Sequence, residues 1–299
     1  MSLLSPQVQA FIAVIEETSF DAAAKRLAVT PSAISQRIKT LEDRIGQLLV
    51  IRQSPCQPTP AGEKLLAKVK PMALLETEVM AEFVPRASTQ AKRFTLAVNE
   101  DSLSTWLIPT LTALHQQHGH LFDLCVDDQD YTLDYVKNGT AIGALTSEKT
   151  PLQGCTCHNL GNMRYYAVAS PQFAKRYFAN GLTPQAFIQA PLIAYNRKDP
   201  LQHRFMEKVT HQALSPNNVH FMPNSSGLVT AATQHMGWCM VAEGLLGDAI
   251  KHQQLVYLAP KMWLDEPLYW QHAAVQSKLL DRVTNALFDA STSELHRSS

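Results

Sequence analysis

The sequence predicts an α+β multidomain protein, and three observations lead to this prediction. Roughly the first sixty residues hold two short helical patterns across a tight turn, followed by two short strand patterns, which is typical of a winged helix-turn-helix domain. One long helical pattern then runs from Thr59 to about Phe83. From Arg93 onward strands and helices alternate, which predicts an α/β region built on a parallel sheet.

The overall composition sets limits on the function. The 299 residues are enough to bury the cores of two or more domains. Lys and Arg number 26 and Asp and Glu number 26, so any affinity for DNA must come from a local cationic patch. No apolar run reaches the roughly eighteen residues of a membrane span, and no signal peptide is recognisable. The five scattered cysteines favour reduced thiols, so we expect a cytoplasmic protein without membrane contact.

Three helices are predicted in the first domain. The first covers residues 5–18 and begins with a Ser-Pro cap, and Asp21 is expected to cap the second. Thr30 is expected to cap the third, with Pro31 in its first turn. Apolar residues at three- and four-residue steps predict a buried face on this third helix, formed by Ala33, Ile34, Ile38, Leu41 and Ile45.

The other face of the third helix carries hydroxyls, an amide and cations, which suit a helix that lies in the major groove of double-stranded DNA. We expect base contacts from Ser32, Ser35 and Gln36. Phosphate contacts are expected from Arg37, Lys39 and Arg52, the last on a wing with strands at 48–52 and 57–59. Thr30 and Pro31 complete the predicted DNA-binding set. Periodicity alone favours an ordinary amphipathic helix pair, and Arg52 is then a plain surface charge.

The long helix from Thr59 to Phe83 carries apolar residues at roughly heptad spacing. Pro71 is expected to kink it. Such a helix is too long and one-sided to be stable alone, so we expect it to pair with a second copy in a homodimer. The polar stretch Pro85–Lys92 is predicted to be a hinge.

The remaining elements follow from periodicity and turn residues. Strands are predicted at 94–98, 122–127, 141–145, 164–169, 192–195, 219–222, 238–241 and 268–273. Helices are predicted at 105–118, 133–138, 171–178, 183–189, 202–209, 226–235 and 278–290. This pattern permits two lobes or a single doubly wound sheet.

Polar residues follow several strands, where open α/β sheets bind ligands. A ligand carboxylate is expected to contact Ser102 and, from the other side, Asn224, Ser225 and Ser226. An ammonium or guanidinium group is expected to contact Glu100, Asp101, Asp127 and Asp128, with Asp130 close by. Helix capping is the alternative: Asp101 or Ser102 would cap one helix, and Asp130 or Thr132 the next. Trp106 is expected in the core.

Neither a metal site nor a catalytic motif is predicted. Cys155, Cys157 and His158 lie close together, but chance spacing in a strand is the favoured interpretation. His115, His118 and His120 are expected to be solvated. Glycine-rich phosphate loops and nucleophile motifs do not occur, so we expect no enzyme and no cofactor.

The N-terminal motifs resemble those of LysR-type transcriptional regulators. They comprise Phe11-Ile12-Ala13-Val14, Ser19-Phe20, Ala22-Ala23-Ala24, Leu27, Thr30-Pro31-Ser32-Ala33-Ile34-Ser35, Ile38, Leu41-Glu42, Leu48-Leu49, Arg52 and Thr59-Pro60-Ala61-Gly62. Further segments resemble the ArgP/LysG branch of that family: Ser35-Gln36-Arg37-Ile38-Lys39, Pro55-Cys56, 99–109 and Tyr269-Trp270.

The resemblance implies a DNA-binding domain at 1–58, a dimerising linker helix and hinge at 59–91, and an effector domain at 92–299. The effector domain would be two-lobed and similar to a periplasmic binding protein, with lobe I at about 92–163 and 267–299 and lobe II at about 164–266. A basic amino acid, lysine or arginine, would be the effector, and an amino acid exporter gene the target. RNA polymerase, a homotetramer and association with the bacterial nucleoid are also implied. An architectural DNA-binding protein without effector, or an α/β solute-binding protein, is the alternative.

Overall fold

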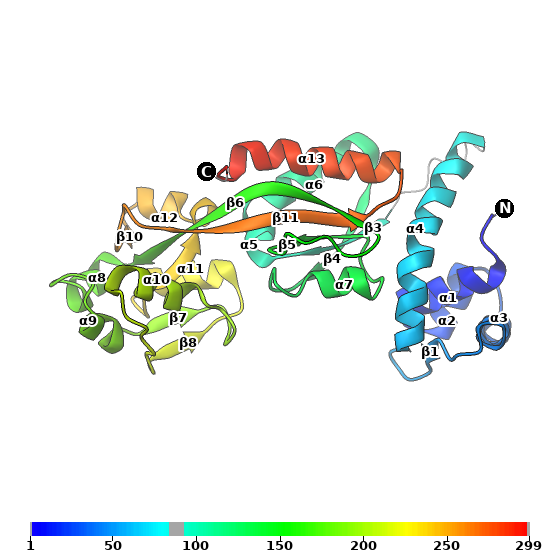
Figure 1. The fold of residues 1–299 in the computed structure, drawn as a ribbon, viewed down its shortest axis with the longest axis horizontal. Coiled ribbons are helices and arrows are strands. Elements are labelled where there is room, and N and C mark those ends of the chain that lie inside the picture. The colour runs from blue at the N-terminus through cyan, green and yellow to red at the C-terminus, as the bar shows by residue number, and fades with distance from the viewer. Residues whose placement is uncertain (1, 84–92, 298–299) are drawn as a thin grey trace. The chain divides into compact units, whose positions relative to one another are not determined.

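The computed structural model describes residues 2–83 and 93–297 (Figure 1). The chain divides into two compact units. Unit 1 holds residues 1–98, 113–158 and 270–286, and unit 2 holds residues 99–112, 159–269 and 287–299. The predicted hinge at Pro85–Lys92 lies outside the described residues, and the predicted domain boundaries stay predictions.

The helix-turn-helix begins with α1 (Pro6–Glu16), α2 (Phe20–Arg26) and α3 (Pro31–Ile45). Thr30 caps α3 as predicted, because its hydroxyl accepts a hydrogen bond from the Ala33 N–H. The predicted cap of α2 is wrong. Ser19 is extended and its hydroxyl accepts the Ala22 N–H, whereas Asp21 lies within the first turn.

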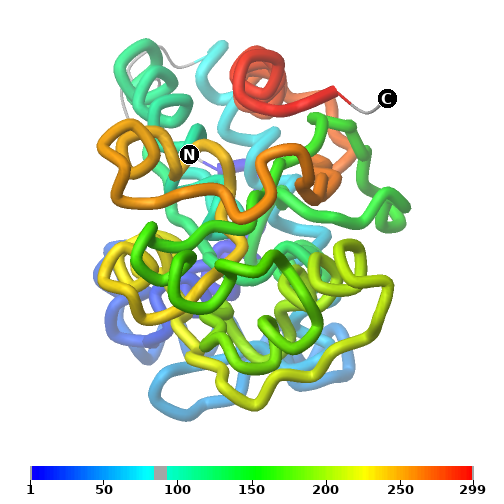
Figure 2. Tube along the Cα trace, turned by 90° about the vertical axis from the view of Figure 1, so that its left-hand side faces the viewer, coloured from blue at the N-terminus to red at the C-terminus, as the bar shows by residue number. Residues whose placement is uncertain are grey.

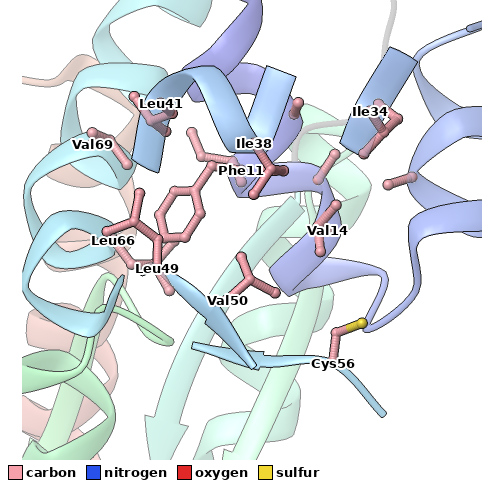
Figure 3. Packing of buried hydrophobic residues seen from close by; sticks show 14 of the residues in the cluster. Phe11, Val14, Ile34, Ile38, Leu41, Leu49, Val50, Cys56, Leu66 and Val69 are labelled. Carbon is pink, nitrogen blue, oxygen red and sulfur yellow. The ribbon is translucent and has the colours of Figure 1, made fainter. Parts of the chain in front are cut away.

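The core of this domain gathers side chains from α1, α3, β1 (Val50–Ile51) and α4 (Pro60–Phe83). Figure 3 shows Phe11, Ile38 and Leu66 pointing into this cluster. Ile45 was expected on the buried face of α3, yet 40% of its surface is exposed because it lies at the last turn of the helix. The wing strands β1 and β2 (Gln57–Pro58) pair antiparallel and are shorter than predicted.

Helix α4 continues through Pro71 without ending. Its first turn packs tightly: a Cβ added at Gly62 would lie 2.1 Å from the carbonyl oxygen of Leu49. Along its length Met72 and Val79 are exposed, which leaves an apolar surface on a helix of 24 residues.

Unit 1 also contains a parallel sheet, as the alternating pattern predicts. Strand β3 (Arg93–Val98) lies between β4 (Leu121–Val126) and β5 (Gly143–Thr146), parallel to both. Helix α7 (Leu133–Lys137) lies in this unit, while α6 (Ile108–His118) begins in unit 2 and ends in unit 1. Val136, on α7, belongs to a buried cluster with Ala97 and Ala144 of this sheet.

Unit 2 begins with α5 (Glu100–Ser102) and a π-helical turn η2 (Leu103–Leu107). Its strands β9 (Cys239–Ala242) and β10 (Val256–Tyr257) pair antiparallel with β6 (Cys155–Ala169). The remaining helices in the described part of the chain are α8 (Pro171–Tyr177), α9 (Pro184–Gln189), α10 (Leu201–Thr210), α11 (Ser225–Thr233), η3 (Glu243–Leu245), α12 (Gly247–Lys251) and α13 (Lys278–Glu294).

The sheet topology decides between the two architectures that the pattern permits. The larger sheet has the order β10-β6-β11-β5-β3-β4, with β9 also on β6, and β11 covers Leu264–Ala273. Strands β7 (Leu192–Ala194) and β8 (Val219–Phe221) form a separate parallel pair, whose course lies in the yellow-green part of Figure 2. The single doubly wound sheet is therefore wrong, and the α+β multidomain architecture with a two-part α/β region is confirmed.

Two further sequence-based expectations have clear outcomes. Trp106 is buried, as expected for a core residue. His120 is also buried, contrary to the prediction, because its ring packs edge-on against Phe94 with 5.2 Å between the ring centres.

Cys155 and Cys157 lie on β6, and the described residues contain no group of three or more His, Cys, Asp or Glu that could hold a metal. Within 2–83 and 93–297, no helix is long and apolar enough to cross a membrane.

We expect Gly62→Ala to destabilise the DNA-binding domain by about 1–3 kcal/mol, because the added methyl group meets rigid backbone. The urea midpoint of unfolding measures the effect. Gly247→Ala is the control, since no atom lies within 4 Å of its added Cβ. It should leave stability unchanged or raise it by about 0.4–1 kcal/mol. Equal losses in the two variants would contradict the tight contact.

Candidate functional site

The first candidate site is the outward face of α3. Ser35 lies three residues and Gln36 four residues after Ser32, and Lys39 follows Gln36 by three residues and Ser35 by four, so these side chains form a single stripe along the helix. Ser32, Gln36 and Lys39 are exposed and Ser35 is half-buried. Arg37 is also half-buried and flanks this stripe. Polar groups on an accessible helical stripe can bond to base edges and phosphates, so the arrangement suits major-groove binding.

The N-terminal turn of α3 orders two of the predicted DNA-binding residues. The Thr30 hydroxyl lies 2.9 Å from the Ser32 hydroxyl and also accepts the Ala33 N–H. Pro31 occupies the first helical position, where no N–H is needed. Thr30, Pro31 and Ser32 thus form one exposed polar edge at the start of the helix.

Arg52 is brought against α3 by the wing. Its Nη1 donates to the Ser35 hydroxyl at 3.2 Å, and its guanidinium lies 5.4 Å from the ring centre of Phe20. Its Nη2 lies 3.5 Å from a carboxylate oxygen of Glu42. Glu42 is buried, and its other oxygen accepts the backbone N–H of Leu49 at 2.9 Å. The structure therefore joins the wing to the polar stripe, although contact with DNA stays a prediction.

The second candidate site centres on Asp101 in unit 2. Its carboxylate accepts a hydrogen bond from the Ser225 hydroxyl at 2.6 Å and one from the Tyr165 hydroxyl at 2.7 Å. These contacts join α5, α11 and β6. Burial raises the pKa of Asp101, the two hydrogen bonds oppose that shift, and the nearby carboxylates of Asp199 and Glu100 raise the pKa further.

Glu100 lies beside Asp101 and contacts the start of α11. One of its carboxylate oxygens accepts the Asn224 side-chain amide at 3.1 Å and the Ser225 backbone N–H at 3.3 Å. The structure therefore brings together Glu100, Asp101, Asn224 and Ser225, four of the predicted effector-binding residues. The residues expected to bind a cation, Glu100 and Asp101, accept hydrogen bonds from the residues expected to bind a carboxylate, Asn224 and Ser225.

Capping does not explain Asp101, which was the open alternative. Asn99 is the N-cap of α5, and Asp101 and Ser102 lie inside that turn. Ser102 is fully buried, and its hydroxyl lies 3.5 Å from the Met163 sulfur. Ser226 is exposed in the first turn of α11.

The remaining predicted acids belong to unit 1. Asp127 accepts the Asp128 backbone N–H at 2.8 Å and the Tyr135 hydroxyl at 3.3 Å. Asp128 in turn accepts the Asp130 N–H at 3.2 Å. Neither proposed cap is formed by a side chain here, because the Thr132 hydroxyl donates to the Leu145 carbonyl at 2.6 Å instead. The part of Asp127 and Asp128 in effector binding stays a prediction.

Two residues near Asp101 escaped the sequence analysis. Tyr165 lies on β6, and nothing in a strand pattern marks its hydroxyl as a partner of Asp101. Asp199 follows β7 and its carboxylate accepts the Leu201 N–H at the start of α10. Its position after a strand and before a helix is the same signal that singled out Asp101, so it was available from the sequence.

Comparisons with known proteins cover nearly the whole chain. Residues 6–63 match the family described as bacterial regulatory helix-turn-helix protein, lysR family, and residues 87–294 match the LysR substrate binding domain. The HTH-type transcriptional regulator LysG of Mycobacterium tuberculosis is 41% identical over 292 residues, which cover 98% of this chain and 94% of LysG.

Two solved structures show the same arrangement of elements. The crystal structure of ArgP from Mycobacterium tuberculosis matches with a TM-score of 0.87 and 41% identity, covering 99% of this chain and all of that one (100%). Full-length LysG from Corynebacterium glutamicum, with bound effector Arg, matches with a TM-score of 0.75 and 30% identity. That match covers 98% of this chain and 100% of the other.

The raised pKa of Asp101 can be tested by the pH dependence of the free energy of unfolding. Because its folded-state pKa lies above the unfolded value of about 3.9, its contribution to the free energy of unfolding is fully present below that pH. The contribution is lost as the pH rises through the folded pKa. Asp101→Asn cannot ionise, so we expect the stability of the variant relative to wild type to increase as the pH rises from about 4 through the folded-state pKa of Asp101. Urea unfolding across that range measures it, and a difference independent of pH would refute the shift.

Proposed function

The chain belongs to the LysR family of bacterial regulatory helix-turn-helix proteins, and on that premise we propose that it senses a basic amino acid, lysine or arginine. The observation that supports this effector is the environment of Asp101. The charged groups that shift its pKa, Asp199 and Glu100, are themselves acids. A ligand that carries an ammonium or guanidinium group would relieve this repulsion and pair with the half-buried carboxylate of Asp101.

The relatives support the same effector class. The matched Corynebacterium glutamicum LysG structure contains bound effector Arg. Arginine and lysine combine a side-chain cation with an α-carboxylate and an α-ammonium group. The carboxylate of Asp101 would bind a cationic group, and the amide and backbone N–H donors at the start of α11 would bind a carboxylate.

On the DNA side, α3 would lie in the major groove. Ser32, Ser35 and Gln36 would contact base edges, and the cations Arg37, Lys39 and Arg52 would contact phosphates. The exposed apolar surface of α4 supports pairing with a second copy, which would present two copies of α3 to a two-fold symmetric site.

The remaining parts of the proposal concern regulation. The dimer would have two arrangements that differ in the placement of the two DNA-binding domains. Effector binding would favour one of them, because the effector has a higher affinity for that arrangement. This would alter contact with RNA polymerase at the promoter of an amino acid exporter gene. Assembly into a homotetramer, action at the nucleoid in the bacterial cytoplasm and the lack of an enzymatic activity belong to the same proposal.

We expect substitutions on α3 to separate affinity from specificity. Arg37→Ala and Lys39→Ala should weaken binding to all duplexes, and each should reduce the salt slope by about one. Gln36→Ala should instead lower the preference for the operator by about 1–3 kcal/mol. Fluorescence anisotropy with selected and random duplexes at several salt concentrations measures both effects. Lys175→Ala, an exposed cation on α8, is the control. Unchanged affinity of Arg37→Ala would show that the docking is wrong.

We expect the wild-type protein to be stabilised by lysine or arginine in a melting screen of the twenty amino acids. Ligand at a hundred times its dissociation constant adds about 2.7 kcal/mol. Asp101→Asn should weaken lysine binding at least about tenfold in calorimetry, because the proposed ion pair between Asp101 and the ligand cation is lost. Affinity should also fall as the pH drops through the raised pKa of Asp101, since protonation removes its charge.

The same titrations test the acids of unit 1. Asp128→Asn is expected to reduce lysine affinity, and an unchanged dissociation constant would remove Asp128 from the site. Asp248→Asn, an exposed acid on α12, controls for the loss of one surface charge. If none of the twenty amino acids stabilises the protein, an architectural role without effector replaces this proposal.

A further inference from the structure

The N-terminus of α11 holds a carboxylate that belongs to the chain itself. Asn224 is the N-cap of this nine-residue helix, and its side-chain oxygen accepts the Gly227 N–H at 2.6 Å. Its side-chain nitrogen and the Ser225 N–H both donate to the same carboxylate oxygen of Glu100. The first N–H groups of a helix have no partner within the helix and carry partial positive charge. This position therefore suits a carboxylate, and Glu100 supplies one.

The two acids of α5 are held very differently. Asp101 is bound by hydroxyl groups at 2.6 and 2.7 Å, in surroundings that raise its pKa through burial. Glu100 is bound at 3.1 and 3.3 Å, and one of its two donors is the exposed side chain of Asn224. The bond from the exposed Asn224 side chain contributes little net stability, because water can replace it, and the bond from the Ser225 N–H is longer than either bond to Asp101. Glu100 is thus the acid that another group can displace, while Asp101 stays in place.

Repulsion weakens the hold on Glu100 further. The charge of Glu100 is one of the causes that raise the pKa of Asp101, so the two carboxylates disfavour each other. Moving Glu100 away from the α11 N-terminus would reduce that repulsion. A ligand that carries both a carboxylate and a cationic group would replace the Glu100 carboxylate at α11. It would also bring a positive charge close to Asp101.

We propose that Glu100 is an intramolecular competitor for the effector: its carboxylate occupies the place at Asn224 and Ser225 that the α-carboxylate of the amino acid takes when it binds. This inference rests on the proposed basic amino acid effector and deepens it. Glu100 then lowers the affinity for lysine and arginine and sets the concentration at which the protein responds. It does not compete with cadaverine or agmatine, which keep the side-chain cation but lack the carboxylate.

Calorimetry on the full chain tests the proposal with wild type, Glu100→Ala and Glu100→Gln. Glu100→Ala should bind lysine and arginine roughly 3- to 10-fold more tightly, which corresponds to the loss of a competing weak hydrogen-bonded contact. Glu100→Gln keeps an acceptor without the charge, so its affinities should lie between those of Glu100→Ala and wild type. Cadaverine and agmatine should bind Glu100→Ala as they bind wild type, or more weakly.

The control and the contrary outcomes are equally specific. Glu207→Ala removes an exposed acid of α10 in the same unit and should leave every affinity unchanged. If Glu100→Ala binds lysine no better than wild type, or less well, the proposal is wrong and Glu100 contacts the cation of the effector or nothing. That result leaves the proposed function intact, because wild type still binds lysine. If wild type and both variants bind no basic amino acid, the proposed function and this inference fail together. Should Glu100→Ala not fold, Glu100→Gln decides.

Discussion

The half-buried carboxylate of Asp101 is a constraint on the elements that meet around it in the second unit. A carboxylate removed from water is costly unless hydrogen bonds replace its hydration. Ser225 and Tyr165 provide those bonds from α11 and β6, so one ionisable group ties three separate elements together. Its charged neighbours are acids, which leaves the cluster short of positive charge. The structure therefore brings several carboxylates close together at this place in the fold.

The carboxylate of Glu42, which is buried, has a comparable role in the DNA-binding domain. Glu42 accepts backbone N–H groups of the wing and faces Arg52, so the position of the wing depends on α3 itself. The inner side of α3 is fixed by Ile34 and Ile38 in the core. The outer polar stripe is therefore oriented by groups that need not touch DNA. This separation lets the outer side chains vary without loss of the fold.

Local features were predictable from the sequence, and long-range partners were not. Thr30 and Pro31 mark the start of α3 because a cap and a first-turn proline act within a few residues. The cap of α2 was missed because Ser19 and Asp21 both suit that role, and only the backbone conformation chooses between them. Asp101 was singled out by its place after a strand. Tyr165 lies 64 positions from Asp101 in the sequence, and no local pattern predicts the hydrogen bond between its hydroxyl and Asp101.

The close approach of Gly62 to Leu49 has a mechanical consequence. Because the backbone of α4 packs directly on the backbone before β1 at this point, little room is left for the two to shift against each other, and they would tilt together. Helix α4 has 24 residues and is therefore about 36 Å long. A tilt of roughly 5° about one end moves the other end by about 3 Å, which is close to the rise of about 3.4 Å per base along one DNA strand. A small change in the angle of α4 would thus be enough to move its far end by about one base step.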